Sequence, residues 1–368
     1  MKKVRHVLGI SGGKDSAALA IYMKDKYPEL DIEYYTCDTG KELDETYQLI
    51  NNLEVYLGKK IVRLQAADGS NESPFDHFLK MYGGFLPSSN SRWCTKVLKL
   101  VPFEKYVGDD PVISYVGIRG DEDREGYISK KSNVQSIFPF RKNIWSEDVI
   151  AKMLPNNNIE NLNAIFSNLP RTQYTKKIDE ILRQPLTQNF TLNQKLNLLL
   201  DAHTETFNNL VFAFLKTTAY PLAQAESFQL LSNNDVLVRD DIFRLLRESG
   251  VGVPEYYEKR QFDSNGKTGE YARSRSGCYF CFFQQKIEWI WLYEQHPHLF
   301  AKAMQYEKQG YTWNQEESLE ELIKPERVRK IKEEYLKRTQ RQSNNNKSHY
   351  LLDILDEVEG EGCASCFI

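Results

Sequence analysis

A glycine-rich segment near the N-terminus carries the most recognisable chemistry in the sequence. Two glycines allow positive φ and a close approach of the backbone to an anion. A helix that starts directly after them presents free N–H groups and a partial positive charge. Ser11 and Ser16 add hydroxyl donors and Lys14 adds a point charge, so we predict a phosphate-binding loop. It is not a Walker A loop, because Asp15 stands where that pattern requires Ser or Thr. The segment reads Ser11-Gly12-Gly13-Lys14-Asp15-Ser16.

Strand and helix signals alternate around this loop. Residues 4–10 form an apolar run that predicts a buried strand, and residues 16–27 have the spacing of an amphipathic helix. The alternation predicts an α/β fold, a doubly wound parallel sheet. The remaining elements expected in this part are strands over 31–37, 60–65 and 111–118 and a helix over 42–56.

Composition divides the 368 residues into four segments. Residues 1–145 carry the α/β pattern of a nucleotide-binding domain. Residues 146–240 are rich in Asn and Leu and contain no glycine, and their helix-like runs predict a helical insertion. Residues 241–339 are expected to form a helical C-terminal region with a Cys-x-x-Cys loop, and residues 340–368 a linker and a cysteine-containing tail.

Charge and hydropathy exclude several classes of protein. Hydrophobic residues make up 41% and charged residues 27%, so a sizeable core is expected. The net charge of -3 gives no bulk attraction for nucleic acid, although a local basic face remains possible. No apolar run approaches the roughly 18 residues of a spanning helix, and the apolar part of the N-terminus is too short for a signal peptide. We expect a cytoplasmic protein that does not contact membranes.

The six cysteines are clustered in a way that predicts metal or redox chemistry in a cytoplasmic protein. The spacing of Cys278 and Cys281 lets both sulfurs reach one metal ion. Thiolate sites of this kind suit zinc and iron–sulfur clusters equally on geometry. Cys37, in an apolar strand, is expected to be an ordinary core residue. The cysteines stand at positions 37, 94, 278, 281, 363 and 366.

The hexapeptide resembles the PP-loop of the adenine nucleotide α-hydrolase superfamily, the N-type ATP pyrophosphatases. Three further motifs resemble its phosphoadenosine phosphosulfate (PAPS) reductase branch, and the resemblance covers residues 4–145 and 240–315. The motifs are Cys37-Asp38-Thr39-Gly40 followed by Glu45-Thr46, Arg92-Trp93-Cys94-Thr95 with Lys96 and Lys99, and Gly117-Ile118-Arg119 followed by Asp121, Asp123 and Arg124.

This resemblance implies ATP as the bound nucleotide. Lys14, Ser16 and the loop amides would stabilise the charge on the leaving pyrophosphate, and Mg²⁺ would bridge the phosphates with Asp15 orienting it. The catalytic residues expected are Lys14, Asp15, Ser16 and Arg119. The nucleotide-binding residues expected are Ser11, Gly12, Gly13, Lys14, Asp15, Ser16, Asp38, Thr39, Gly40 and Arg124.

The same resemblance favours a 4Fe-4S cluster, with zinc as the alternative. It implies Cys94, Cys278 and Cys281 as ligands. Cys366 or Cys363 would be the fourth ligand, and the other tail cysteine a mobile thiol that carries sulfur or resolves a disulfide.

The family picture that fits these motifs is the PAPS reductase-like protein of DNA phosphorothioation, the DndC/SspD type, which acts in phage defence. It implies DNA and other sulfur-modification proteins, including a cysteine desulfurase, as partners. The basic segment 324–341 predicts either contact with a phosphate backbone or a solvated helix face. Three other functions stay open: a PAPS or APS reductase with Cys363 or Cys366 as nucleophile, a tRNA thiolase, and a non-enzymatic nucleotide sensor.

Overall fold

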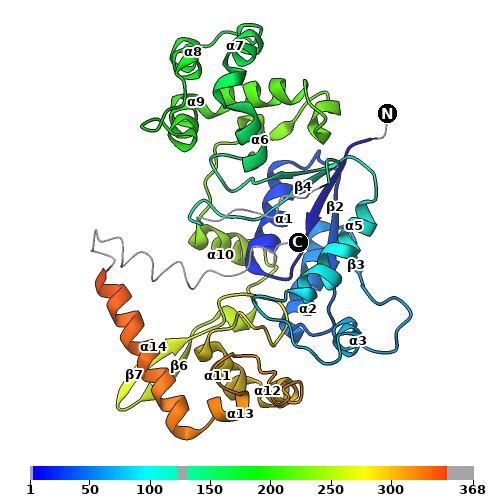
Figure 1. Ribbon diagram of the computed structural model, residues 1–368, viewed down its shortest axis with the longest axis vertical. Helices are drawn as coiled ribbons and strands as arrows, with labels where there is room; N and C mark the ends of the chain where they lie inside the picture. The colour runs from blue at the N-terminus through cyan, green and yellow to red at the C-terminus, as the bar shows by residue number, and fades with distance from the viewer. Residues whose placement is uncertain (1–2, 123–130, 346–368) are drawn as a thin grey trace.

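The computed structural model describes residues 3–122 and 131–345. Its centre is a five-stranded parallel sheet in the order β3-β2-β1-β4-β5, with helices on its faces (Figure 1). The doubly wound α/β fold expected from the sequence is therefore confirmed. The strands are β1 (Arg5–Gly9), β2 (Ile32–Cys37), β3 (Ile61–Leu64), β4 (Val112–Tyr115) and β5 (Val134–Ile137).

The strand order reverses at β1. Leu8 in this central strand lies opposite Tyr34 of β2 on one side and Tyr115 of β4 on the other. The chain therefore leaves β1 towards β2 and β3, and later returns to add β4 and β5 on the opposite side. Ligands of open α/β sheets bind at such a switch point, beyond the carboxyl ends of the strands.

Helix α1 (Lys14–Lys26) starts at this switch point. Its residues from Lys14 to Met23 are all buried, because it packs between the sheet, α2 (Asp44–Leu57) and α10 (Arg239–Glu248). The helix therefore has little amphipathic character and is covered on every side over its first turns. The shorter helical elements after β3 are α3 (Pro74–Met81), α4 (Trp93–Thr95), the π-helical η1 (Lys96–Leu100) and α5 (Val101–Val107).

The segment after β5 forms the expected helical insertion, drawn in green at one end of the molecule in Figure 1. Its apolar residues join those of α1 and the sheet in one continuous core. The longest helical element of the insertion, residues 192–215, is kinked at His203, whose backbone is extended (φ -173°). The insertion contains α6 (Glu147–Met153), α7 (Ile159–Ser167), α8 (Thr175–Arg183) and α9 (Leu192–Leu215).

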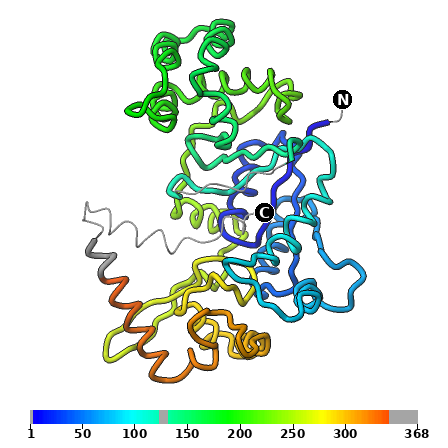
Figure 2. Tube along the Cα trace, in the orientation of Figure 1, coloured from blue at the N-terminus to red at the C-terminus, as the bar shows by residue number. Residues whose placement is uncertain are grey.

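The C-terminal region lies at the opposite end of the molecule, as the chain trace shows (Figure 2). It contains an antiparallel hairpin of β6 (Arg260–Ser264) and β7 (Lys267–Tyr271) that was not predicted. Its first two helices meet at His296, because Pro297 cannot continue the preceding helix. The helices are α11 (Lys286–Gln295), α12 (Pro297–Met304), α13 (Leu319–Leu322) and α14 (Pro325–Asn345), the last of which runs into the start of the predicted linker.

A search of the described residues for a membrane-spanning helix, one both long enough and apolar enough, finds none.

Candidate functional site

The predicted phosphate loop joins β1 to α1 at the switch point, and it is packed too closely to accept side chains at its glycines. Gly12 has φ +71°, and a Cβ atom there would lie 2.2 Å from Cγ2 of Thr46. A Cβ atom on Gly13 would lie 2.5 Å from Oγ of Ser276. The glycines therefore serve both backbone conformation and close packing, and the packing partners come from distant parts of the chain.

The two serines of the loop are hydrogen-bonded within it. The hydroxyl of Ser16 donates to the carbonyl of Gly13 (3.2 Å) and lies 3.1 Å from the hydroxyl of Ser11. The N–H of Gly13 in turn donates to Ser11 Oγ (3.3 Å). In this structure the serine hydroxyls hold the loop in shape, whereas the sequence predicted them as donors to the ligand.

Two tyrosines that sequence reasoning missed support the loop from the C-terminal region. The hydroxyl of Tyr256 donates to the carbonyl of Gly12 (3.1 Å), and the N–H of Lys14 donates to the hydroxyl of Tyr257 (3.4 Å). The ammonium of Lys14 also lies 5.1 Å from the ring centre of Tyr257, within range of a cation–π interaction. No local motif marks these tyrosines, because they stand more than 240 residues after the loop.

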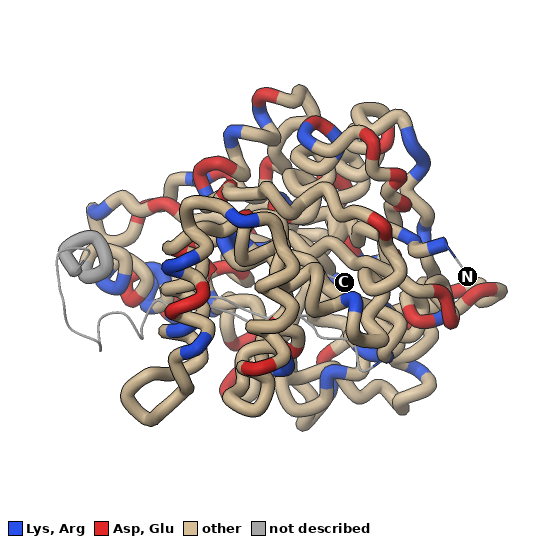
Figure 3. The backbone as a smooth tube through the Cα atoms, turned by 90° about the horizontal axis from the view of Figure 1, so that it is seen from above, with Lys and Arg blue, Asp and Glu red and all other residues tan. Residues whose placement is uncertain are grey.

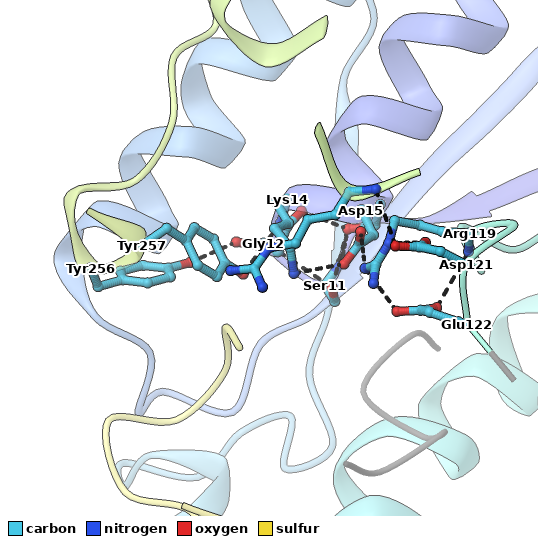
Figure 4. Close-up of polar contacts among 12 residues, drawn as sticks. Ser11, Gly12, Lys14, Asp15, Arg119, Asp121, Glu122, Tyr256 and Tyr257 are labelled. Atoms are coloured by element: carbon cyan, nitrogen blue, oxygen red, sulfur yellow. Dashed lines mark hydrogen bonds and ion pairs between the residues drawn. The ribbon is translucent and has the colours of Figure 1, made fainter. Parts of the chain in front are cut away.

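A buried ion network joins the loop to the segment after β4 (Figure 4). One oxygen of Asp15 lies 3.1 Å from Nζ of Lys14 and the other lies 2.9 Å from Nη1 of Arg119. Arg119 also contacts Glu122 (2.8 Å) and Asp121 (2.8 Å). Lys14, Asp15 and Arg119 are each no more than 7% exposed. The structure thus brings three of the four predicted catalytic residues into direct contact, with Ser16 beside them in the loop.

Burial and pairing act in opposite directions on the two cations. Burial lowers the pKa of Lys14, and the adjacent Asp15 carboxylate opposes part of that shift. Burial also acts to lower the pKa of Arg119, but Asp15 and Glu122 outweigh it and raise that pKa. Arg119 is therefore a permanent positive charge at the loop, whereas the charge of Lys14 depends on its partner.

The geometry of the loop does not favour the predicted role of Asp15 in orienting Mg²⁺. Both oxygens of Asp15 already contact cations, Lys14 and Arg119. Asp121 likewise accepts hydrogen bonds on both oxygens, from Arg119 Nε (2.8 Å) and from the N–H of Arg239 (3.4 Å). A magnesium ion arriving with a nucleotide would therefore be held mainly by phosphate oxygens, which is its usual mode of binding.

A pocket opens beside the loop, at the carboxyl end of β2. Asp38 lines this pocket, and its Oδ1 accepts hydrogen bonds from the N–H of Gly40 (2.9 Å) and the hydroxyl of Tyr47 (2.9 Å). Thr39 is buried and Gly40 has φ +72°. The predicted nucleoside residues thus lie next to the phosphate loop. The pocket is lined by Ser11, Thr36, Cys37, Asp38, Glu42, Tyr47, Ile50, Arg63, Lys99 and Gly277.

Glu42 is a further polar residue of this pocket that the sequence did not single out. Its carboxylate accepts hydrogen bonds from the hydroxyls of Thr39 (2.6 Å) and Tyr47 (3.0 Å). Burial raises the pKa of Glu42, and the neighbouring Asp38 adds to the shift. The pocket therefore holds a carboxyl group that ionises less readily than an exposed one.

The Cys-x-x-Cys loop packs against the end of β2, next to this pocket. Its Tyr279 N–H donates to the carbonyl of Lys41 (2.7 Å), and Cys278 Sγ lies 3.3 Å from the hydroxyl of Thr39. Between the cysteines, Phe280 packs against Phe75 with a ring-centre distance of 4.6 Å. Backbone pairing and aromatic packing therefore fix the loop.

No disulfide joins the described cysteines of this region, Cys94, Cys278 and Cys281. Burial raises the pKa of Cys94 to about 11, and the nearby Cys281 adds to the shift. Burial also raises the pKa of Cys278. Within residues 3–122 and 131–345, however, no three His, Cys, Asp or Glu side chains are arranged to hold a metal ion. The described thiols alone do not fit a cluster, so no chemical step is assigned to one.

Some predicted site residues cannot be placed. Arg124, together with Asp123 of the same motif, and the tail residues Cys363 and Cys366 lie outside the described residues. Cys37 lies where the sequence predicted, packed against the apolar cluster of Tyr35 and Phe103. Burial raises its pKa to about 12.

The basic segment 324–341 lies on α14, where its cations are interleaved with carboxylates. Arg327 pairs with Glu317 (2.6 Å) and Lys332 pairs with Glu294 (2.6 Å), which ties α14 to its neighbours. In the view of Figure 3, positive and negative residues are likewise interspersed along the described chain. This pairing favours a structural role for much of the segment.

Comparison with known proteins agrees with the geometry of the loop. Residues 5–167 match the family model of the phosphoadenosine phosphosulfate reductase domain. This segment is therefore similar to the PAPS reductase domains of the PP-loop superfamily. Domains of this type bind nucleotide, and the matched segment includes the phosphate loop, Asp38, Cys94 and Arg119. It covers less than half of the chain and excludes Tyr256, Tyr257 and the Cys-x-x-Cys loop.

Two curated relatives match over similar lengths, and both are described as uncharacterized. One is protein MJ0066 of Methanocaldococcus jannaschii, 33% identical over 154 residues, which are 38% of this chain and 30% of the relative. The other is nin region protein ORF290 of Escherichia phage lambda, 30% identical over 146 residues, or 32% of this chain and 49% of the relative. The chain thus spans less than half the length of each relative.

Proposed function

We propose that the protein is an ATP pyrophosphatase, which cleaves ATP between the α- and β-phosphates and transfers AMP to an acceptor. The observation that carries this proposal is the position of Lys14 and Arg119. Both cations are fixed on one buried carboxylate, Asp15, at the N-terminus of α1. The helix N-terminus adds free N–H groups at the same place, so the loop offers both charged and neutral donors to a phosphate group.

The arrangement of the two parts of the site supports cleavage next to the α-phosphate. We assign the nucleoside to the pocket at the end of β2, which Asp38 lines, and the pyrophosphate to the phosphate loop. Ser11 belongs to both, since it lines the pocket and is hydrogen-bonded within the loop. A nucleotide that spans both places its α-phosphate near Ser11. Fixed charges at the loop then stabilise the charge that develops on departing pyrophosphate.

For the acceptor, we propose a DNA backbone phosphate that is activated for sulfur insertion. An acceptor oxygen attacks the α-phosphorus, the bond to the β-phosphate oxygen breaks, and pyrophosphate leaves with the electron pair. A sulfur nucleophile at the oxidation level of sulfide then displaces AMP, which carries the acceptor oxygen away. The motifs of the PAPS reductase branch support this proposal. The sulfur source would be a partner of the cysteine desulfurase class.

A second candidate is reduction of PAPS or APS, which the description of the matched domain favours. In that reaction a thiolate attacks the sulfur of the sulfate group. The bond from this sulfur to the phosphate oxygen breaks, and the nucleotide leaves with the electron pair on that oxygen. The tail cysteines Cys363 and Cys366 are the candidate nucleophiles. A tRNA thiolase and a non-enzymatic nucleotide sensor remain as outcomes of the same experiment.

The experiment compares nucleotides and acceptors side by side. Anaerobically purified protein is incubated with Mg²⁺-ATP alone, with DNA, or with tRNA, and in parallel with PAPS. AMP and pyrophosphate that increase with DNA support the proposal, whereas an increase with tRNA alone identifies a thiolase. Sulfite from PAPS with ATP unchanged contradicts the proposal in favour of the reductase. Binding of ATP without turnover in any mixture identifies a sensor.

A further inference from the structure

The charges at the phosphate loop do not by themselves favour a polyanion. Two cations, Lys14 and Arg119, contact three carboxylates, those of Asp15, Asp121 and Glu122. The group therefore carries a net negative charge before any ligand arrives. A triphosphate that approaches this end of the site requires additional positive charge close by.

Arg239, at the first residue of α10, lies at the same place. Its backbone N–H donates to Asp121 Oδ2 (3.4 Å), and its guanidinium lies 5.8 Å from the ring centre of Phe243. Phe243 packs edge-on against Tyr257 at 6.1 Å, and Tyr257 accepts the N–H of Lys14. The positive charge of Arg239 contributes to lowering the pKa of Lys14, which agrees with this proximity.

The backbone in front of Arg239 is fixed against the turn that carries Arg119. Gly120 N–H donates to the carbonyl of Leu237 (2.9 Å), and Leu237 N–H donates to the carbonyl of Phe140 (3.0 Å). A Cβ atom on Gly120 would lie 2.3 Å from Val236, so these two segments are in close contact. Arg239 is therefore placed next to the ion network by short-range backbone packing.

The Arg239 side chain is exposed, and no ion pair joins it to a carboxylate anywhere in residues 3–122 and 131–345. Arg244, five positions later on the same helix, differs in this respect because it pairs with Asp241 at 2.7 Å. Arg239 also lies on the loop side of the site, since no residue of α10 lines the pocket at the end of β2.

We propose that Arg239 is a third phosphate-binding cation, which contacts the pyrophosphate part of a bound nucleotide on the outer side of Lys14. This inference rests on the proposed function for the choice of nucleotide, but its ligand chemistry is that of any pyrophosphate group. A guanidinium suits the role because its planar donors can contact two phosphate oxygens at once.

The test measures equilibrium binding of inorganic pyrophosphate, ATP and AMP by titration calorimetry, with wild type, Arg239→Gln, Arg239→Lys and the control Arg244→Gln. We expect Arg239→Gln to weaken pyrophosphate and ATP binding by about tenfold or more, the contribution of one hydrogen bond to a charged group. AMP binding should be unchanged, Arg239→Lys should be intermediate, and Arg244→Gln should match wild type.

Three results would overturn the inference: unchanged pyrophosphate binding in Arg239→Gln, an equal loss of AMP binding, or no pyrophosphate binding by wild type. Turnover is not needed for this measurement. If Arg239→Gln binds pyrophosphate weakly but wild type fails to cleave ATP, the proposed function fails and the role of Arg239 stands.

Discussion

The phosphate end and the cysteine end of the site are built in opposite ways. At the phosphate end, Asp15 contacts both its chain neighbour Lys14 and Arg119 in a buried network. At the cysteine end, Cys94 and Cys278 come from distant segments and are buried thiols whose pKa values are raised by burial. A strand–helix turn positions its residues through local geometry, whereas the thiols depend on tertiary packing. Local sequence motifs therefore predict the phosphate end more reliably than the cysteine end.

The largest effect is expected from Lys14→Ala. Removal of this charge should lower kcat for ATP cleavage by about 10²–10³-fold, the usual effect of losing one fixed group that stabilises transition-state charge. The control is Lys24→Ala in the last turn of the same helix, where the ammonium lies 4.4 Å from the ring centre of Tyr56. Steady-state assays of AMP release compare the two. Equal rates in Lys14→Ala and wild type would show that the loop takes no part in ATP cleavage.

Gly12→Ala is expected to reduce stability as well as activity. Strain from positive φ and overpacking against Thr46 should together cost about 2–4 kcal/mol of unfolding free energy. Gly58→Ala is the matched control, because Gly58 has φ +63° and nothing within 4 Å of the added Cβ atom. It should cost only about 1–2 kcal/mol. Denaturant unfolding measures the stability of both variants. Equal losses of unfolding free energy would show that the close packing at Gly12 does not add to the cost of the substitution.

The lowered pKa of Lys14 predicts a change in the pH profile. Since burial lowers this pKa, the neutral amine forms at lower pH than in a free lysine, and the loop loses positive charge as pH rises. The value of kcat/KM, which reports the free enzyme, should therefore fall on the alkaline side. Lys14→Arg should be slower overall but should lack this alkaline fall. An identical fall in both proteins would assign it to another group.

The smallest effect on nucleotide cleavage is expected from Cys278→Ser, because no step of ATP cleavage uses this thiol. AMP release should stay close to the wild-type rate, whereas sulfur transfer to the acceptor should be reduced. Iron and zinc analysis of the same samples tests the metal hypothesis, which predicts metal in wild type and its loss in the variant. A collapse of AMP release in Cys278→Ser would contradict the separation of the two ends.

The sequence predicted the parts of the fold that depend on local pattern. The loop, the first three strands, α1 and α2 follow from apolar runs and the glycine pair, and β4 was expected over a slightly longer range. The short strand β5 was missed. The β6–β7 hairpin was also missed, although Asn265-Gly266 marks its turn, because the surrounding residues were interpreted as helical. Both turn residues have positive φ, as such turns require.

The candidate site was predictable only in part, for a related reason. Lys14, Asp15 and Arg119 were identified from motifs, and the structure brings them into contact. Tyr256 and Tyr257, which contact the loop, lie beyond the helical insertion, and Arg239 lies at its end. Nothing in their own neighbourhood of the sequence marks these residues. Their role depends on packing between α1, α10 and the segment after it, which only the folded chain shows.

The central claim is cleavage between the α- and β-phosphates, and isotopic labelling of ATP tests it most directly. Protein is incubated with Mg²⁺ and ATP labelled with ³²P at either the α- or the γ-position, with DNA present, and the products are separated. We predict that γ-label appears in pyrophosphate and that an equal amount of α-label appears in AMP, either free or attached to the DNA. Label from the γ-position in inorganic phosphate, with α-label in ADP, would contradict it.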